Sequence, residues 1–449
     1  MKKALNELNL SPSAVEGFLR LYEKYKQGPA KIADWESVRS PDPTALLRYE
    51  SLTEPDEDVF RVQLKRLAVC KLNGGLGTSM GCEGPKSSII VRGGKTFLDL
   101  IVEQLDELQS RFQGSVPLVL MNSFYTHEAT VKFIQKYPGG PGIRVFQQNK
   151  FPRLIEGSES FLAQDDPGPK AWYPPGHGDF YDCIRGNGLL DDLLEEGREI
   201  LFISNVDNLG AVVDSRILNH MLERDIPFLI EMTEKTPADV KGGTMYQEDG
   251  KLKLLEIARV PDEHVDEFCG LRKFRVFNTN NIWINLAHLR KKLEEGPLDL
   301  DVIVNRKTVD GQNVIQLETA IGSALECFPG AAGLTVSRGR FLPVKKTDDL
   351  LLVQSDLFNL EKGRLVRNPQ RTLPGLPVVR FGKTFEGLED YRKRIPQIPR
   401  ILELKSLDLE GDVRFEGQAT LKGEVRLAGR EKSLTIPKDA VLEDQVIEQ

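Results

Sequence analysis

The sequence predicts an α/β protein in which a mixed, mostly parallel sheet lies between helices and a parallel β-helix follows. Short apolar runs separated by helical patterns occupy residues 66–350, which is typical of strands buried in a parallel sheet. Beyond residue 400, glycines recur every six residues, and this is the period of a parallel β-helix. With 449 residues, the chain has room for two or three domains.

The predicted elements begin with a helix and continue as strands and helices along the chain. Residues 11–27 carry apolar side chains at helical spacing, which predicts an amphipathic helix. An apolar run that ends at Leu72 predicts a strand, and a helical pattern begins at Thr96. Further strands are predicted at residues 116–122, 199–207, 226–232 and 282–286. Because ligands bind beyond the carboxyl ends of the strands in such sheets, we expect the chemistry in the loops that follow them.

Changes in composition divide the chain into four parts. Residues 1–60 form an N-terminal appendage with the first helix, and residues 61–355 form the α/β domain. Residues 356–400 are rich in proline and connect this domain to the repeat at residues 401–449. In the repeat, an apolar residue lies two positions before each of the glycines Gly411, Gly417, Gly423 and Gly429. An antiparallel stack of hairpins with coincidental spacing is the alternative interpretation.

Composition and charge exclude several classes of protein. Apolar residues make up 40% and charged residues 28% of the chain, so the chain as a whole is not disordered. A net charge of −7 argues against nucleic acid as a partner, because nucleic-acid binding relies on a basic surface. No apolar stretch approaches the roughly 18 residues of a membrane span, and residues 1–10 lack the pattern of a signal peptide. Five cysteines without a CxxC pair indicate reduced thiols, so we expect a cytoplasmic protein.

The clearest chemical signal is the segment from Lys71 to Ile89, KLNGGLGTSMGCEGPKSSI. Its glycines allow the backbone to approach a ligand closely and allow N–H groups to converge on an anion. The spacing is neither GxGxxG nor GxxxxGK[ST], because Lys86 follows Gly77 by nine residues. A strand, a glycine-rich loop and a Pro-Lys pair before a well-formed helix predict a phosphate site that includes Lys86.

The motif LNGGLGT…GPKS resembles the signature of the eukaryotic-type UTP–glucose-1-phosphate uridylyltransferases, also called UDP-glucose pyrophosphorylases. Other segments resemble this family in the same order, among them WYPPGHGD at 172–179, SNVDNLGA at 204–211, FNTNN at 277–281 and RFLPVKKTDDLLLVQSDL at 340–357. The likeness covers roughly residues 60–360. It implies a Rossmann-like nucleotidyltransferase fold for residues 61–355 and a left-handed β-helix at the C-terminal end.

The resemblance implies a reaction as well as a fold. The phosphate of glucose 1-phosphate would attack the α-phosphorus of UTP in line, giving UDP-glucose and pyrophosphate. Catalysis would consist mostly of positioning and of charge neutralisation by Mg²⁺ and lysines, without a covalent nucleophile. A homo-oligomer formed through the C-terminal β-helix is compatible with the resemblance.

Three residues carry the chemistry by resemblance to the family. Asp207 lies at the end of a predicted strand and is assigned to Mg²⁺, which prefers oxygen ligands. Lys86 and Lys345 are assigned to the phosphates and to the charge that develops during transfer. Lys346 is the alternative to Lys345, because adjacent residues of a strand face opposite ways.

The remaining site residues are implied by the resemblance. Gln148 is assigned to the uracil edge, because a carboxamide offers a donor and an acceptor that suit an imide, with its neighbour Gln147 as the alternative. The implied nucleotide-binding residues are Leu72, Asn73, Gly74, Gly75, Lys86, Gln148, Gly176, Asp207 and Lys345. Those implied for the sugar phosphate are Gly74, Gly75, His177, Asn205, Val206, Asp207, Lys241, Asn278, Asn281 and Glu318. Further candidates are Gly242, Gly243, Asn280 and Thr319.

Two other functions are weighed against this interpretation. A broad-specificity UDP-sugar or UDP-N-acetylhexosamine pyrophosphorylase is the nearest alternative among enzymes. A non-catalytic nucleotidyltransferase-like scaffold is an alternative from another class. The scaffold predicts loss of the loop lysine or of the metal aspartate, whereas Lys86 and Asp207 are both present.

Overall fold

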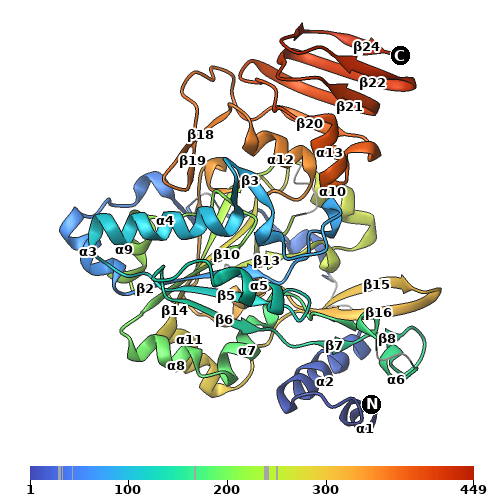
Figure 1. Cartoon of the computed structure of the whole chain (residues 1–449). Helices are drawn as coiled ribbons and strands as arrows, with labels where there is room; N and C mark the ends of the chain where they lie inside the picture. The colour runs from blue at the N-terminus through green and yellow to red at the C-terminus, as the bar shows by residue number, and fades with distance from the viewer. Residues whose placement is uncertain (29–31, 33, 43, 166–167, 237–241, 249–250) are drawn as a thin grey trace. The chain divides into compact units, whose positions relative to one another are not determined.

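A computed structural model describes the chain except for residues 29–31, 33, 43, 166–167, 237–241 and 249–250 (Figure 1). The chain forms two compact units. Unit 1 comprises Met1–Gly74, Leu108–Asn205 and Val213–Arg338, and unit 2 comprises Gly75–Glu107, Val206–Val212 and Gly339–Gln449. The linear boundaries expected after residues 60, 355 and 400 stay predictions. No helix in the described part of the chain is long and apolar enough to cross a membrane.

Unit 1 is built on an eight-stranded sheet. Its strands, in spatial order, are β1 (Leu46–Arg48), β17 (Ala332–Thr335), β11 (Phe228–Glu234), β14 (Val276–Asn285), β10 (Ile200–Asn205), β2 (Leu67–Asn73), β5 (Leu118–Asn122) and β6 (Ile143–Gln147). Strand β14 runs antiparallel to both of its neighbours, and the other neighbouring strands are parallel. The predicted α/β fold with a mixed, mostly parallel sheet is therefore confirmed.

Strand β14 differs from the prediction, which placed a strand only at residues 282–286. The strand begins at Val276, so the polar segment FNTNN lies inside the sheet rather than in a loop. Its pairing with β11 is irregular: Ile282 faces Ile230 and Asn278 faces Met232, which leaves three residues of β14 opposite Glu231. Asn280, at the centre of this bulge, has a left-handed φ of 60°.

Helices lie on both sides of this sheet. Helices α7 (Phe180–Gly186), α8 (Leu189–Glu195) and α11 (Leu286–Glu295) pack against one face, and α3 (Glu57–Leu64) and α9 (Ser215–Glu223) lie on the other (Figure 1). The apolar runs that predicted buried strands are explained by this double cover.

The predicted N-terminal helix is confirmed as α2 (Pro12–Lys26), and the Ser11 side chain caps it by accepting a hydrogen bond from the N–H of Ala14. The aromatic ring of Phe18 packs edge-on against Phe151 and Phe161. The other elements of unit 1 are α1 (Lys2–Asn6), α5 (His127–Ile134), β7 (Phe151–Pro152), β8 (Leu154–Ile155), α6 (Leu162–Asp165), β9 (Trp172–Tyr173), β12 (Thr244–Glu248), β13 (Lys251–Leu255), α10 (Val265–Cys269), β15 (Ile303–Val309) and β16 (Gln312–Glu318).

Unit 2 starts with the glycine-rich loop and ends with the repeat. Its elements before the repeat are β3 (Ile90–Arg92), β4 (Lys95–Thr96), α4 (Phe97–Phe112) as far as Glu107, α12 (Thr347–Gln354), β18 (Phe358–Glu361), β19 (Arg364–Arg367), β20 (Val378–Phe381) and α13 (Leu388–Arg394). The repeat contains β21 (Leu404–Phe415), β22 (Thr420–Ile436), β23 (Val441–Glu443) and β24 (Val446–Glu448). One apolar core joins the repeat to α12, α13 and the start of α4.

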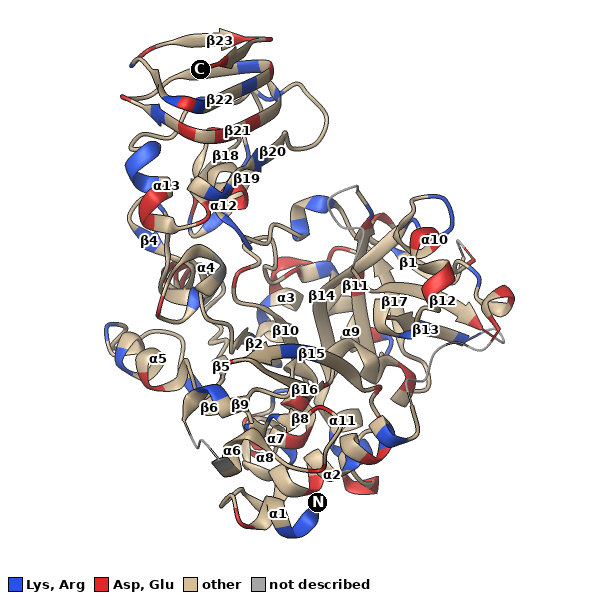
Figure 2. Ribbon diagram, turned by 90° about the vertical axis from the view of Figure 1, so that its right-hand side faces the viewer, with Lys and Arg blue, Asp and Glu red and all other residues tan. Residues whose placement is uncertain are grey.

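The repeat is a stack of parallel strands, so the antiparallel alternative is wrong. Leu409 lies beside Leu427, three hexapeptides further along the chain, and both are buried. Charged residues of both signs alternate with other residues along β21 and β22 (Figure 2). The φ of Gly411 is 70°, and a Cβ there would lie 2.0 Å from the carbonyl oxygen of Gly429. Only glycine fits where the strands turn this closely.

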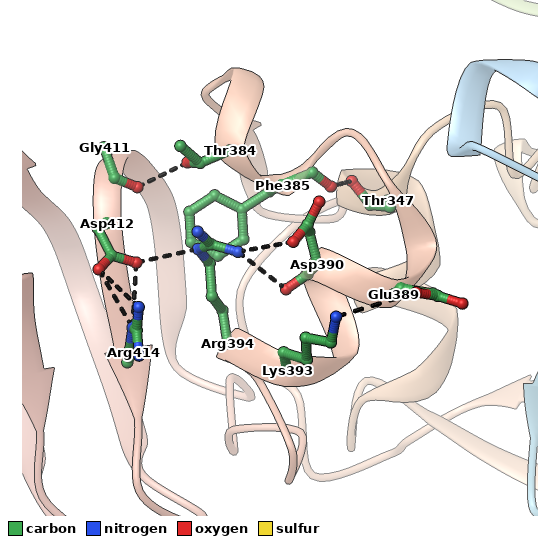
Figure 3. A network of polar contacts seen from close by, with 10 residues as sticks. All are labelled: Thr347, Thr384, Phe385, Glu389, Asp390, Lys393, Arg394, Gly411, Asp412 and Arg414. Carbon is green, nitrogen blue, oxygen red and sulfur yellow. Dashed lines mark hydrogen bonds and ion pairs between the residues drawn. The ribbon is translucent and has the colours of Figure 1, made fainter.

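A polar network ties the repeat to helix α12 (Figure 3). The Arg394 side chain lies 3.2 Å from Asp390 in its own helix and 3.2 Å from Asp412 on β21. The Thr384 hydroxyl donates to the carbonyl of Gly411 at 2.6 Å. At the other end of the network, the Thr347 hydroxyl donates to the carbonyl of Phe385 at 2.7 Å. The first residue of α12 is therefore anchored to the base of the repeat.

Candidate active site

The glycine-rich loop of unit 2 folds back on itself and returns Lys86 to the start of the loop. The N–H of Gly77 donates to the carbonyl of Gly84, and the N–H of Lys86 donates to the carbonyl of Gly75, both at 3.2 Å. Beyond this turn, the Lys86 ammonium lies 2.5 Å from Oδ2 of Asp207. Two of the three predicted catalytic residues are therefore in direct contact.

A backbone hydrogen bond links the segment of Lys345 to Asp207. The N–H of Val344, the residue before Lys345, donates to the carbonyl of Asp207 at 3.1 Å. The N–H groups of Lys345 and Lys346 both donate to Oδ2 of Asp349, at 2.8 and 3.0 Å. Lys346 is the N-cap of α12, and Lys345 precedes the helix. Unit 2 thus gathers all three predicted catalytic residues.

Asp207 fits a magnesium site in which the protein supplies few of the ligands. No group of three or more His, Cys, Asp or Glu side chains that could enclose a metal occurs within the described ranges. Mg²⁺ in phosphate-transfer sites is held by one or two carboxylates, and phosphate oxygens and water complete its six ligands. A single carboxylate at the end of a strand fits this arrangement and does not fit an all-protein cage. Val206, which precedes it, is buried.

The predicted base-recognition residues lie together in unit 1. A Cβ on Gly74 would lie 2.4 Å from Nε2 of Gln148, so the glycine makes room for this carboxamide. Gln148 is 6% exposed, and its Oε1 has no hydrogen-bond partner among the described residues. A buried acceptor without a partner is costly, and a ligand donor would remove that cost. Leu72 packs on the core of the unit. The neighbouring Asn73 amide donates within the protein to Asn122 and Thr130.

The GHG segment packs against the end of β16. Gly176 has a φ of 82°, and a Cβ there would lie 2.4 Å from the carbonyl oxygen of Thr319. A Cβ on Gly178 would lie 2.4 Å from the Thr319 hydroxyl. Both glycines are therefore required by this close approach. Glu318, the last residue of β16, directly precedes Thr319. Burial raises the pKa of its carboxyl group.

The protonation of His177 follows from its hydrogen bond. Its Nδ1 lies 2.9 Å from the backbone N–H of Ile321, which can only donate, so Nδ1 is the acceptor. Desolvation lowers the pKa of this histidine to about 4. At neutral pH the ring is therefore uncharged, and its proton is on Nε2, which can donate to a ligand.

The predicted sugar residues on β14 separate into two groups. Asn280 donates to Oδ1 of Asn205 at 3.0 Å, and its own N–H donates to Oδ1 of Asn278 at 2.8 Å. The Oδ1 of Asn280 is buried and has no partner among the described residues. In contrast, Asn281 is fully buried and donates to Glu231 at 3.1 Å, so it faces the interior of the sheet. Sequence reasoning did not anticipate this division.

Two further features complete the account of the predicted residues. Lys241 lies outside the described residues. Near it in the sequence, a Cβ on Gly243 would lie 2.5 Å from Oε1 of Glu256, whose carboxyl pKa is raised by burial. Sequence reasoning also missed Asp179, the last residue of GHGD, which is buried and bound to Asn149. An aspartate directly before a helix is typical of a cap, and the sequence pattern carries no signal of the bond to Asn149.

Comparison with known proteins identifies the family of the chain. The family model described as UTP--glucose-1-phosphate uridylyltransferase matches residues 15–422. Proteins of that name are 46% identical in Hordeum vulgare, over 98% of this chain and 94% of theirs, and 45% identical in Saccharomyces cerevisiae, over 100% and 93%. The structure of a Leishmania major UDP-glucose pyrophosphorylase mutant in complex with UDP-glucose is 32% identical, with a TM-score of 0.90 over 100% of this chain and 98% of that one. The chain therefore belongs to the UTP–glucose-1-phosphate uridylyltransferase family.

Proposed function

We propose that this protein transfers UMP from UTP to glucose 1-phosphate, giving UDP-glucose and pyrophosphate. The observation that carries the proposal is the contact of Lys86 with Asp207, beside the backbone that leads into Lys345. A carboxylate among lysines suits a reaction that neutralises phosphate charge and needs no covalent intermediate.

In the proposed reaction, a phosphate oxygen of glucose 1-phosphate forms a bond to the α-phosphorus of UTP. The bond from that phosphorus to the oxygen that bridges to the β-phosphate breaks, and pyrophosphate leaves with the bonding electrons. Lys86 binds the UTP phosphates, and Lys345 neutralises the charge that develops in the transition state. Asp207 would hold Mg²⁺, which supplies further positive charge when bound.

The residues of unit 1 would supply specificity. The unpartnered Oε1 of Gln148 would accept the N3–H of uracil, while its Nε2 donates to the O4 atom. The uncharged His177 would donate from Nε2 to glucose 1-phosphate. The cluster of Asn205, Asn278 and Asn280, together with Glu318, would bind sugar hydroxyls, and Asn280 still has an acceptor to offer.

Four finer points belong to the same proposal. The parallel repeat at residues 401–449 forms a left-handed β-helix. It supports a homo-oligomer, and the exposed Val441 and Val446 on its last strands suit such a contact. The enzyme works in the cytoplasm, with Mg²⁺ as its cofactor.

A direct assay tests the function. Pyrophosphate release is measured with UTP and glucose 1-phosphate, with and without Mg²⁺, and after chelation with EDTA. Turnover that requires both substrates and the metal is expected. Release that is unaffected by omitting glucose 1-phosphate would indicate hydrolysis of UTP and contradict the proposal.

A further inference from the structure

Asp179 in unit 1 is a buried carboxylate that the proposed reaction does not use. It is 3% exposed and directly precedes helix α7. An aspartate in this position normally caps the helix, yet its side chain makes no capping hydrogen bond. Both carboxylate oxygens instead accept from Asn149: the backbone N–H reaches Oδ2 at 2.7 Å, and the side-chain Nδ2 reaches Oδ1 at 2.8 Å. Apart from the Cys183 thiol of α7, which donates to Oδ2, its hydrogen-bond donors lie in the loop that contains Asn149.

Burial makes this arrangement costly for the fold. Desolvation raises the pKa of Asp179 to about 6, and the groups that act on it are Asn149, Cys183 and Asp182, none of which is a cation. The Cys183 thiol donates at 3.2 Å, and Asp182 is paired with Arg20 instead. A buried carboxylate without a paired cation lowers stability, so its presence calls for a compensating role.

The loop that Asp179 holds contains Gln148. The N–H bound by Oδ2 belongs to the peptide group that directly follows Gln148, and the N–H of Gln148 itself donates to the carbonyl of Asn122 at 2.8 Å. The backbone of Gln148 is therefore fixed on both sides. Its carboxamide extends from this fixed point to Gly74.

We propose that Asp179 is a positioning residue for base recognition: it fixes the peptide after Gln148 and thereby the carboxamide that selects uracil. This rests on the proposed role of Gln148. Uracil presents a donor at N3 and an acceptor at O4, whereas cytosine presents the reverse pattern. A carboxamide distinguishes the two patterns only when it reaches the base edge at hydrogen-bond distance and angle, and this reach depends on where the backbone of Gln148 is held.

The test compares two neighbouring carboxylates of the same segment. Asp179→Asn keeps the size of the side chain but removes an acceptor for Asn149. We expect a rise of about tenfold in KM for UTP, a fall of about tenfold in the kcat/KM preference for UTP over CTP, and a kcat within about twofold of the parent. Asp182→Asn, three residues later, is the control and leaves these values unchanged. Equal effects of the two variants, or loss of kcat with an unchanged KM, would overturn the proposal.

A second set of variants separates positioning from a purely structural effect. Gln148→Ala and the double variant with Asp179→Asn complete a cycle, and if Asp179 acts through Gln148 the double variant is no worse than Gln148→Ala alone. Additive effects would overturn the proposal while leaving the role of Gln148 intact. A Gln148→Ala variant with parental KM and base preference would instead refute that underlying role. If Asp179→Asn does not fold, Asn149→Ala, which keeps the backbone bond, shifts the base preference in the same direction by a smaller factor.

Discussion

The Lys86 ammonium and an Asp207 carboxylate oxygen lie 2.5 Å apart, and their side chains are only 12% and 14% exposed. In this arrangement the two charges neutralise each other. The proposed reaction assigns the lysine to phosphates and the aspartate to a metal, so binding of the metal nucleotide must exchange one ion pair for two new contacts. Truncation of either residue therefore leaves the other with an altered charge environment.

Replacement of Asp207 tests the metal role. Asp207→Asn keeps the size and removes the charge, so we expect kcat to fall by about 10²-fold or more. The apparent affinity for Mg²⁺, measured by titration of activity, should fall as well. Asp408→Asn, at a half-buried position on β21, is the control. A folded Asp207→Asn variant with near-parental kcat at ordinary Mg²⁺ would contradict the assignment.

The two lysines should differ in their kinetic signatures. Lys86→Ala is expected to weaken UTP binding and to lower turnover, because Lys86 is proposed to bind the phosphates at the end of the glycine-rich loop. Lys345→Ala is expected to lower kcat by about 10²-fold with a smaller change in KM, because it acts on charge in the transition state. Steady-state kinetics with each substrate varied will distinguish them. If Lys345→Ala keeps the parental kcat and KM while Lys346→Ala is inactive, the role belongs to Lys346 instead.

His177 should make stability depend on pH. Its folded-state pKa of about 4 lies below the ordinary value of 6.5, so the unfolded chain binds the proton more tightly. Its contribution is complete above about pH 6.5 and is lost as the pH falls towards 4, by up to about 3 kcal/mol. His177→Asn can still accept from Ile321 but does not titrate there. In denaturant unfolding from pH 7 to 4.5, the parent should lose more stability than this variant, and parallel losses would refute the shift.

Two glycines test the packing of unit 2. Gly411 and Gly375 have φ values of 70° and 67°, but only at Gly411 does a new Cβ meet backbone, at 2.0 Å. Gly375→Ala should cost about 1 kcal/mol from backbone strain alone. Gly411→Ala should cost about 3 kcal/mol, because overpacking adds to the strain. Urea unfolding of both variants measures the difference. An equal loss in the free energy of unfolding would show that the strand can accommodate a Cβ at Gly411.

Sugar choice separates narrow from broad specificity. A site built on hydroxyl hydrogen bonds rejects a substrate that leaves buried polar groups unpaired. We expect kcat/KM with UTP and glucose 1-phosphate to exceed every other pairing by at least about tenfold, or roughly 1.4 kcal/mol. Galactose 1-phosphate, in which one hydroxyl is inverted, should lose less kcat/KM than N-acetylglucosamine 1-phosphate does. Comparable efficiency with the acetylated sugar would favour a broad UDP-sugar pyrophosphorylase.

The strands that could be predicted from sequence are those with continuous apolar runs. Strands β5 and β10 are examples, because both of their faces are covered and every residue but Asn205 at the end of β10 is buried. The first half of β14 could not be predicted in this way, since its polar residues bond to one another and to Glu231 inside the sheet. Hydrophobic periodicity does not register a buried polar network.

The site shows the same limit. The order of motifs was enough to place Lys86, Asp207 and Lys345 among the candidates, and the structure gathers them in one unit. The orientation of a side chain depends on tertiary contacts that local sequence does not contain. Asn281 turns inward to Glu231, and Asp179 binds Asn149 instead of capping the helix that it precedes.

The position of the asparagines on β14 has a consequence for how sugar preference can change. In many enzymes, specificity is carried by surface loops, which can diverge with little effect on the fold. Here Asn278, Asn280 and Asn281 belong to a central strand between β10 and β11, and Asn281 and Trp283 share the carboxylate of Glu231. A substitution that changes the proposed sugar contacts on this strand also disturbs a network inside the sheet. Laboratory evolution towards other sugars should therefore require compensating stabilising changes elsewhere.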